Sequence, residues 1–192
     1  EIDGILVIDE AYVDFVSDEA HDLTQLAVNS DNIVLLRTLS KGYGLAGLRV
    51  GYGIGPEHLI APMLHKTRDS YNLDAISQQL AEVALADQAY AKSVWERVRL
   101  SRTDLCRDLQ ALGLQVFASE SNFLLATVPP ECPLSAKALY EGLKARHILV
   151  RYFSHDRLQD KLRITVGTVQ ENAQLRAHLA ALLQGEPFSA ST

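Results

Sequence analysis

The stretch LSKGYGLAGLRVGYGIG, residues 39–55, contains GYGLAG, a literal match to the pattern G-x-G-x-x-G. A dinucleotide-binding site requires this glycine turn to open a helix directly after a strand. Directly after Gly47 the chain reads LRVGYGIG, which holds three further glycines and two β-branched residues before Pro56. This composition predicts a strand over residues 48–54 where a dinucleotide site needs a helix. The glycines therefore need another explanation, and the lysine and arginine that bracket them become the residues of interest.

Apolar runs on both sides of this stretch predict a sheet. Residues 5–8 and 33–36 are short, fully apolar segments typical of buried strands. The spacing of apolar residues predicts a helix over residues 19–28, and Pro56 opens another at its favoured first-turn position. The resulting order of strand, helix, strand, strand and helix predicts a mostly parallel or mixed α/β sheet.

From residue 75 the pattern changes to α+β. The segment AISQQLAEVALAD predicts one amphipathic helix, and a longer helical pattern comes after it and ends at Gly113 as a C-cap. Two strands are predicted in LQVFA and NFLLATV, then a helix after Pro133, two more strands in ILVRYF and KLRITVG, and a last helix. We place a domain boundary near the long helix, which separates residues 1–88 from residues 89–192.

Composition excludes several classes of function. The 192-residue chain has a net charge of −6, and its 18 basic residues form no run of the kind that binds nucleic acid. Two cysteines are too few for a disulfide framework, and the dispersed histidines show no zinc-binding spacing, so we expect no metal. No apolar run approaches membrane-spanning length and no signal peptide is visible, which makes the cytoplasm the expected location.

The chain begins abruptly. Its first residue is Glu1 rather than Met, and a strand of the buried type comes almost at once. Such a strand needs neighbouring strands and helices on both faces. We therefore expect a fragment of a longer protein.

Polar side chains with distinct chemistry come after the first two predicted strands and, in the case of Arg49, at the start of the third. Since ligands of α/β sheets bind at the carboxyl ends of strands, we expect these side chains to converge on one crevice. They are an acid, a phenol, two hydroxyls, an amine and a guanidinium, carried by Asp9, Tyr12, Thr38, Ser40, Lys41 and Arg49.

Pyridoxal 5'-phosphate is the cofactor that uses this set of groups. Its aldehyde needs a lysine amine, and its ring nitrogen needs a carboxylate so that the ring can act as an electron sink. Its phosphate needs hydroxyl donors and a cation, for which arginine offers a planar fork. Its phenolic oxygen accepts a hydrogen bond, a task suited to tyrosine. The glycines would let the backbone wind tightly past the cofactor between Lys41 and Arg49.

At these residues the chain resembles the fold-type I pyridoxal-phosphate aminotransferases, and among them the histidinol-phosphate aminotransferase family. The resemblance is carried, in the family's order, by VIDEAYVDF, LLRTLSKGYGLAGLRVGY, SYNLDAISQ, SNFLLA and LRITVGT. It implies that residues 1–88 are the C-terminal part of the cofactor-binding large domain, with a mostly parallel sheet, and that residues 89–192 are the small α+β domain. Members of the family run to about twice this length, so the resemblance also implies that an N-terminal half of the cofactor cage is missing here.

The resemblance implies a role for each candidate residue. Lys41 is similar to the lysine that forms the Schiff base and moves the substrate proton. Asp9 is similar to the residue that pairs with the pyridine nitrogen, and Tyr12 to the one that contacts the phenolic oxygen. The phosphate ligands are implied to be Thr38, Ser40 and Arg49. The residues implied to hold the substrate's anionic group are Arg163, in LRITVG, and its helper Arg151, in LVRYF.

The implied activity is transfer of the amino group of L-histidinol phosphate to 2-oxoglutarate, within histidine biosynthesis and in a homodimer when full length. Threonine-phosphate decarboxylase and an aromatic aminotransferase of the same superfamily remain alternatives. From another class, ILVIDE has the shape of a Walker B strand, although the partner motif G-x-x-x-x-G-K-[ST] of an ATPase is absent.

Three further expectations concern residues outside the implied site. Glu10, beside Asp9, is expected to face away from the site or to cap the strand. His147 and His155 are expected to be surface residues. The packing residues are expected to include Tyr43, Tyr52 and Tyr71.

Overall fold

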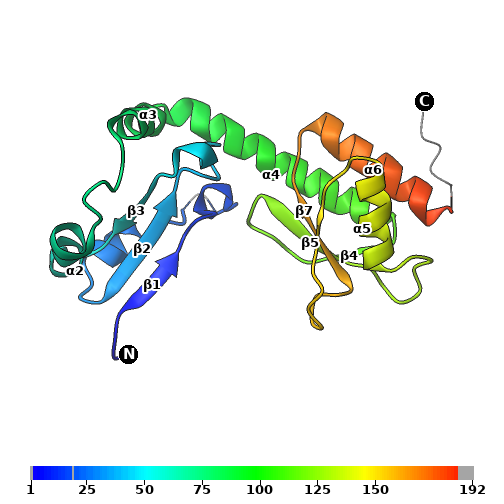
Figure 1. Cartoon of the computed structure of the whole chain (residues 1–192), viewed down its shortest axis with the longest axis horizontal. Coiled ribbons are helices and arrows are strands. Elements are labelled where there is room, and N and C mark those ends of the chain that lie inside the picture. The colour runs from blue at the N-terminus through cyan, green and yellow to red at the C-terminus, as the bar shows by residue number, and fades with distance from the viewer. Residues whose placement is uncertain (1, 19, 186–192) are drawn as a thin grey trace. The chain divides into compact units, whose positions relative to one another are not determined.

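A computed structural model describes residues 2–18 and 20–185 of the chain (Figure 1). The chain forms two compact units, Glu1–Glu96 and Arg97–Thr192. The division falls within the long helix α4 (Gln88–Ala111), whereas the sequence places it near residue 88.

The first unit is built on a mixed sheet of three strands in the order β1-β2-β3, with β2 in the centre (Figure 1). β2 runs parallel to β1 and antiparallel to β3. This agrees with the expected α/β class. The strands are β1 (Leu6–Asp9), β2 (Ile33–Thr38) and β3 (Gly51–Ile54), and the helices are α1 (Thr24–Val28), α2 (Glu57–Pro62), the π-helical segment Met63–Thr67 and α3 (Ala75–Ala86).

Two predicted elements of this unit are shorter than expected. The third strand begins at Gly51 rather than at residue 48, because Ala46–Leu48 form a 3-10 turn and Arg49 has the left-handed φ of 59°. A residue in that conformation cannot continue into a strand. The helix expected over residues 19–28 occupies only Thr24–Val28, and residue 19 lies outside the described residues.

Apolar packing holds the first unit together. Val34 and Leu35 of β2 are buried on opposite faces of the sheet, and Ala27 of α1 is fully buried. An apolar cluster joins Leu39 and Val50, which flank the Ser40–Arg49 segment, to Ala81 of α3. Full burial of a leucine stabilises the fold by about 1.5–3 kcal/mol. The ends of this segment are therefore anchored in apolar packing.

The second unit is α+β, with an antiparallel sheet of order β4-β5-β7-β6. The side chains of β5 and β7 alternate between buried and less buried positions, as expected for a sheet packed on one face. Figure 1 shows helices of this unit lying along its sheet. The strands are β4 (Gln115–Val116), β5 (Phe123–Thr127), β6 (Arg151–Tyr152) and β7 (Lys161–Thr165), and the helices besides α4 are α5 (Ala136–Ala145) and α6 (Val169–Leu183).

Leucines from three helices cover the apolar face of this sheet. On the strands, Leu124 pairs with Ile164 and Ala126 with Leu162, and all four are buried. The buried helical leucines that complete this core are Leu105, Leu109, Leu139, Leu143 and Leu179. No helix in the described part of the chain is long and apolar enough to cross a bilayer.

Helix ends agree with the capping signals in the sequence. Gly113 has a φ of 86° just after α4, which confirms the predicted C-cap. At the end of α5 the same position is held by His147, with a φ of 60°. The backbone N–H groups of His147 and Ile148 donate to the carbonyls of Lys144 and Leu143, the hydrogen-bond pair of a Schellman motif.

His147 therefore occupies a position that favours glycine. We expect His147→Gly to stabilise the protein by about 1 kcal/mol, because the left-handed conformation costs a residue with a Cβ roughly 1–2 kcal/mol. Thermal unfolding measures the gain. His147→Ala is the matched control, since it keeps the Cβ and should bring no gain. Equal stabilisation by both variants would contradict the explanation.

Candidate functional site

Asp9 and Thr38 stand at the carboxyl ends of two parallel strands. In the register of the sheet Asp9 lies beside Leu36, so Thr38, two residues further along β2, shares its face. The Asp9 side chain is exposed, and its Oδ1 accepts a hydrogen bond of 2.9 Å from the backbone N–H of Ala11. An acid and a hydroxyl thus share one face at this end of the sheet.

Glu10 takes the opposite face, as strand alternation requires. It is only 7% exposed, and Arg37 of β2 donates from Nε to its Oε2 at 2.8 Å. His21 Nε2 lies 3.3 Å from the other carboxylate oxygen. The expectation that Glu10 faces away from the site is confirmed, but its ion pairs were not foreseen. In the sequence, the sign of such an ion pair is Arg37, a charged residue directly after the apolar run of residues 33–36.

Lys41 and Tyr12 lie close together. The Lys41 Nζ is 5.8 Å from the centroid of the Tyr12 ring, although the two residues belong to segments that come after different strands. The lysine side chain is exposed. An amine beside a phenol therefore lies at the same end of the first unit as Asp9.

The two hydroxyls differ in their surroundings. The Thr38 hydroxyl donates to the Val50 carbonyl at 3.2 Å and accepts from the Ser40 backbone N–H at 3.1 Å. Within residues 2–18 and 20–185 the Ser40 hydroxyl itself has no hydrogen bond. The Thr38 hydroxyl thus connects Ser40 and Val50, at the two ends of the segment that carries Lys41 and Arg49. The Ser40 hydroxyl, in contrast, is available to a ligand.

Arg49 is held in an unusual conformation. Its φ of 59° and ψ of 38° are left-handed, and its Nη1 donates to the Ala46 carbonyl at 3.0 Å. Non-glycine residues adopt this conformation at a cost of about 1–2 kcal/mol, and such outliers cluster at functional sites. Arg49 is exposed.

In the second unit, Arg151 and Arg163 are direct partners in the β6–β7 register and so point to the same face. Each guanidinium lies over an aromatic ring: Arg163 is 5.0 Å from the Phe123 centroid and Arg151 is 5.5 Å from that of Phe153. In the described chain neither arginine forms an ion pair with a carboxylate. Like charges directly opposite one another destabilise a sheet, so a bound anion would relieve the repulsion between these two arginines.

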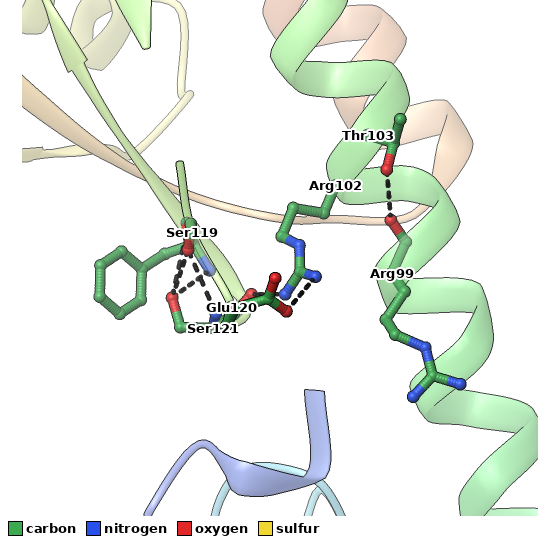
Figure 2. Close-up of polar contacts among 7 residues, drawn as sticks. Arg99, Arg102, Thr103, Ser119, Glu120 and Ser121 are labelled. Carbon is green, nitrogen blue, oxygen red and sulfur yellow. Dashed lines mark hydrogen bonds and ion pairs between the residues drawn. The ribbon is translucent and has the colours of Figure 1, made fainter. Parts of the chain in front are cut away.

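A buried arginine supports the start of β5. Figure 2 shows Arg102 reaching from α4 to the turn that precedes β5, where its Nη1 donates to the Ser121 carbonyl at 3.0 Å and its Nη2 to Glu120 at 3.0 Å. The Ser119 hydroxyl adds a bond of 2.7 Å to the Phe123 carbonyl. These bonds fix the residue on whose ring Arg163 rests.

The remaining expectations have mixed outcomes. Tyr43 packs edge-on against Trp95 with ring centroids 5.5 Å apart, as expected of a packing residue, and His147 and His155 are exposed, as expected. The expectation for Tyr71 is wrong, because its side chain is 100% exposed. No cluster of His, Cys, Asp or Glu within the described ranges could hold a metal ion.

Asp14 is a further acid that the sequence did not single out. It lies in the 3-10 turn Val13–Phe15, against the lysine-bearing segment. Burial raises its pKa from 3.8 to about 6, while Arg37 lowers it and Glu10 raises it further. A raised pKa means that the folded state holds this proton more tightly than the unfolded state does.

The contribution of Asp14 to stability is therefore largest at low pH and is lost as the pH rises from about 4 to about 6. We expect Asp14→Asn to be more stable than the wild type at pH 8, with a difference that shrinks below pH 6 and disappears near pH 4. Urea unfolding across this range measures it, with the exposed Asp69→Asn as control. A difference that grew towards low pH would refute this assignment.

Comparison with known proteins identifies the family. The model of aminotransferase class I and II matches residues 1–179. Histidinol-phosphate aminotransferase 1 of Trichormus variabilis is 52% identical over 184 residues, which are 96% of this chain and 51% of that protein. The histidinol-phosphate aminotransferase of Synechocystis is 47% identical over 182 residues, 95% of this chain and 50% of that protein.

Solved structures agree. The histidinol-phosphate aminotransferase of Sinorhizobium meliloti, determined in complex with pyridoxal-5'-phosphate, superposes with a TM-score of 0.83 at 29% identity, over 95% of this chain and 50% of that one. The chain thus spans about half the length of the curated relatives it matches. The match to the family model covers the strand ends, the lysine segment and the arginine-bearing strands described above, and the chain belongs to the class I and II aminotransferase family.

Proposed function

We propose that the protein is a pyridoxal-phosphate-dependent aminotransferase that acts on L-histidinol phosphate, with 2-oxoglutarate as amino acceptor, in histidine biosynthesis. The observation that carries the proposal is the meeting of Lys41 and Tyr12, with 5.8 Å between amine and ring centroid, at the strand ends that bear Asp9 and Thr38. Relatives near 50% identity are named histidinol-phosphate aminotransferases. The chain supplies the lysine-bearing part of the site.

The donor set fits pyridoxal 5'-phosphate. Lys41 would hold its aldehyde carbon, Asp9 its ring nitrogen and Tyr12 its phenolic oxygen, while Ser40 and Arg49 would hold its phosphate. Thr38 supports this group through the Val50 carbonyl and the Ser40 N–H, and its oxygen remains a candidate phosphate ligand. When bound, the cofactor supplies an electron sink for the charge that develops when the substrate loses a proton.

The chain's own residues supply the proton movements. Lys41, once displaced by the incoming amine, takes the proton from the substrate carbon as a general base and returns it as a general acid. Asp9 would hold the proton on the ring nitrogen of the cofactor by its negative charge. Tyr12, whose ring centroid is 5.8 Å from the Lys41 amine, would donate a hydrogen bond to the phenolic oxygen of the cofactor.

The paired arginines of the second unit support a phosphorylated substrate. Arg151 and Arg163 point to one face, and a dianion accepts charge-assisted hydrogen bonds from both. The rings of Phe123 and Phe153 restrict the two guanidinium groups without neutralising them. We assign the substrate phosphate to this pair.

Other functions have less support. Structures of a decarboxylase and of a threonine-phosphate decarboxylase match at 22% identity, which supports a shared fold alone. The match to the aminotransferase family covers ILVIDE, so that strand needs no ATPase to explain it. We also propose a cytoplasmic homodimer for the full-length protein. The exposed apolar stripe Ile76, Leu80 and Val83 on α3 is suited to a protein contact.

Lys41→Ala in the full-length protein should lower turnover by more than about a thousandfold, because no other amine can bond the cofactor and move the proton. The visible absorbance that arises when the cofactor is bonded to the lysine should also be lost. Lys92→Ala, on the exposed side of α4, is the matched control. Retained turnover in Lys41→Ala would remove the assignment.

Arg151→Ala should raise KM for histidinol phosphate about 10- to 100-fold, since one charge-assisted bond to the phosphate is lost. Unphosphorylated amine substrates should be affected far less. Arg157→Ala, an exposed arginine of the same unit, is the control. An equal loss for phosphorylated and unphosphorylated substrates would argue against the phosphate role.

A further inference from the structure

The backbone just after Lys41 is held on one side by α4. The indole Nε1–H of Trp95 donates to the Gly42 carbonyl at 2.8 Å. The Tyr43 ring packs edge-on against that indole, and Gln88 Nε2 lies 3.0 Å from the Tyr43 hydroxyl, to which it donates. The peptide after the lysine is thus fixed by a hydrogen bond, and the next side chain is fixed by packing.

Asp14 fills the space next to the Gly42 Cα where a side chain would point. Gly42 is buried, and a Cβ added to it would overlap the Asp14 carboxyl group; the three nearest atoms to that Cβ all belong to Asp14. Phe15, only 2% exposed, anchors the turn that carries Asp14. Gly42 is therefore held between a carboxyl group and an indole.

The three glycines of GYGLAG differ in whether, and why, a side chain is excluded at their positions. Gly44 has a φ of 68°, a conformation that favours glycine. Gly47 has no such φ, and a Cβ there would meet nothing within 4 Å. Gly42 also lacks a positive φ, so the contact with Asp14 alone excludes a side chain. Gly47 is a matched control within the same motif.

We propose that Asp14 and Trp95 are positioning residues that hold Gly42 from two sides and thereby fix the Lys41 amine beside Tyr12. The Lys41 side chain is exposed and, within the described residues, forms no hydrogen bond or ion pair, so its position depends on its backbone. The Gly44 N–H, which donates to the Lys41 carbonyl at 3.1 Å, completes the restraint. The catalytic meaning of this arrangement rests on the proposed role of Lys41.

The first test needs no cofactor. Trp95 is the chain's one tryptophan, so its indole N–H gives a single NMR signal that reports the bond to Gly42. We expect Gly42→Ala to shift this signal and to speed its exchange with water, and Gly47→Ala to leave it unchanged. Adding Asp14→Ala to Gly42→Ala removes the overlapping group and should restore the signal, since the two residues are directly coupled.

The outcomes of this test are distinct. An unchanged indole signal in Gly42→Ala, or a double variant as perturbed as Gly42→Ala alone, would overturn the proposal. If Gly42→Ala fails to fold, a folded double variant counts as the same rescue. A double variant that also fails to fold counts against the proposal.

The second test measures the lysine itself. In the full-length protein, pyridoxal 5'-phosphate is trapped with borohydride and the labelled lysine is located by peptide mass. Trp95→Phe removes the N–H donor but keeps a ring. It should slow labelling of Lys41 about tenfold, because a small misplacement of a reacting group slows its reaction. The labelling rate of the control Gly47→Ala should stay within about twofold of the wild-type rate. Equal labelling rates in wild type and Trp95→Phe would overturn the proposal. A wild type that takes no label on Lys41 would instead refute the proposed function. In that case the indole NMR signal alone would decide how Gly42 is held.

Discussion

The ion pair between Glu10 and Arg37 is the interaction on which the site depends. It joins the end of β1 to β2 on the face opposite Asp9, with 2.8 Å between nitrogen and oxygen. A carboxylate as buried as that of Glu10 is tolerated only when it is paired, and removal of one partner of such a pair costs about 3–5 kcal/mol. The pair fixes which side chains at the end of β1 point to each face of the sheet. Asp9 is then directed to the face that also carries Thr38, and the turn with Tyr12 and Asp14 comes directly after it.

Part of this arrangement is readable from local sequence. Apolar runs predict β1 and β2, and the polar residues at their ends are brought to one end of the sheet because the two strands are parallel. The start of β3 is not readable in the same way. Arg49 adopts a positive φ through its place in the fold, and no local propensity of arginine indicates it. The role of Asp14 is not readable from local sequence either, since it comes from contact with Gly42, a residue far along the chain.

In the second unit the sequence predicts the strands but not their partners. The motifs around Arg151 and Arg163 are visible, while the register that makes the two residues neighbours depends on how β6 and β7 pair. Arg102 illustrates the same limit. It is a buried arginine in the middle of a long helix, and only the three-dimensional contact with the Ser121 carbonyl and Glu120 explains why the core accepts its charge. The exposure of Tyr71 shows that an aromatic residue within a family motif is not always a packing residue.

The antiparallel pairing of β2 with β3 has a consequence for how the site can change. Thr38 and Gly51 are register partners, and the Leu39 N–H donates to the Val50 carbonyl at 3.1 Å, so the segment that carries Lys41 and Arg49 is one closed hairpin loop. Both groups therefore lie in one loop whose two ends are fixed by the pairing of β2 with β3. In evolutionary terms, a length change inside the loop would alter the lysine and the arginine together, whereas the strands on which they stand could keep their register.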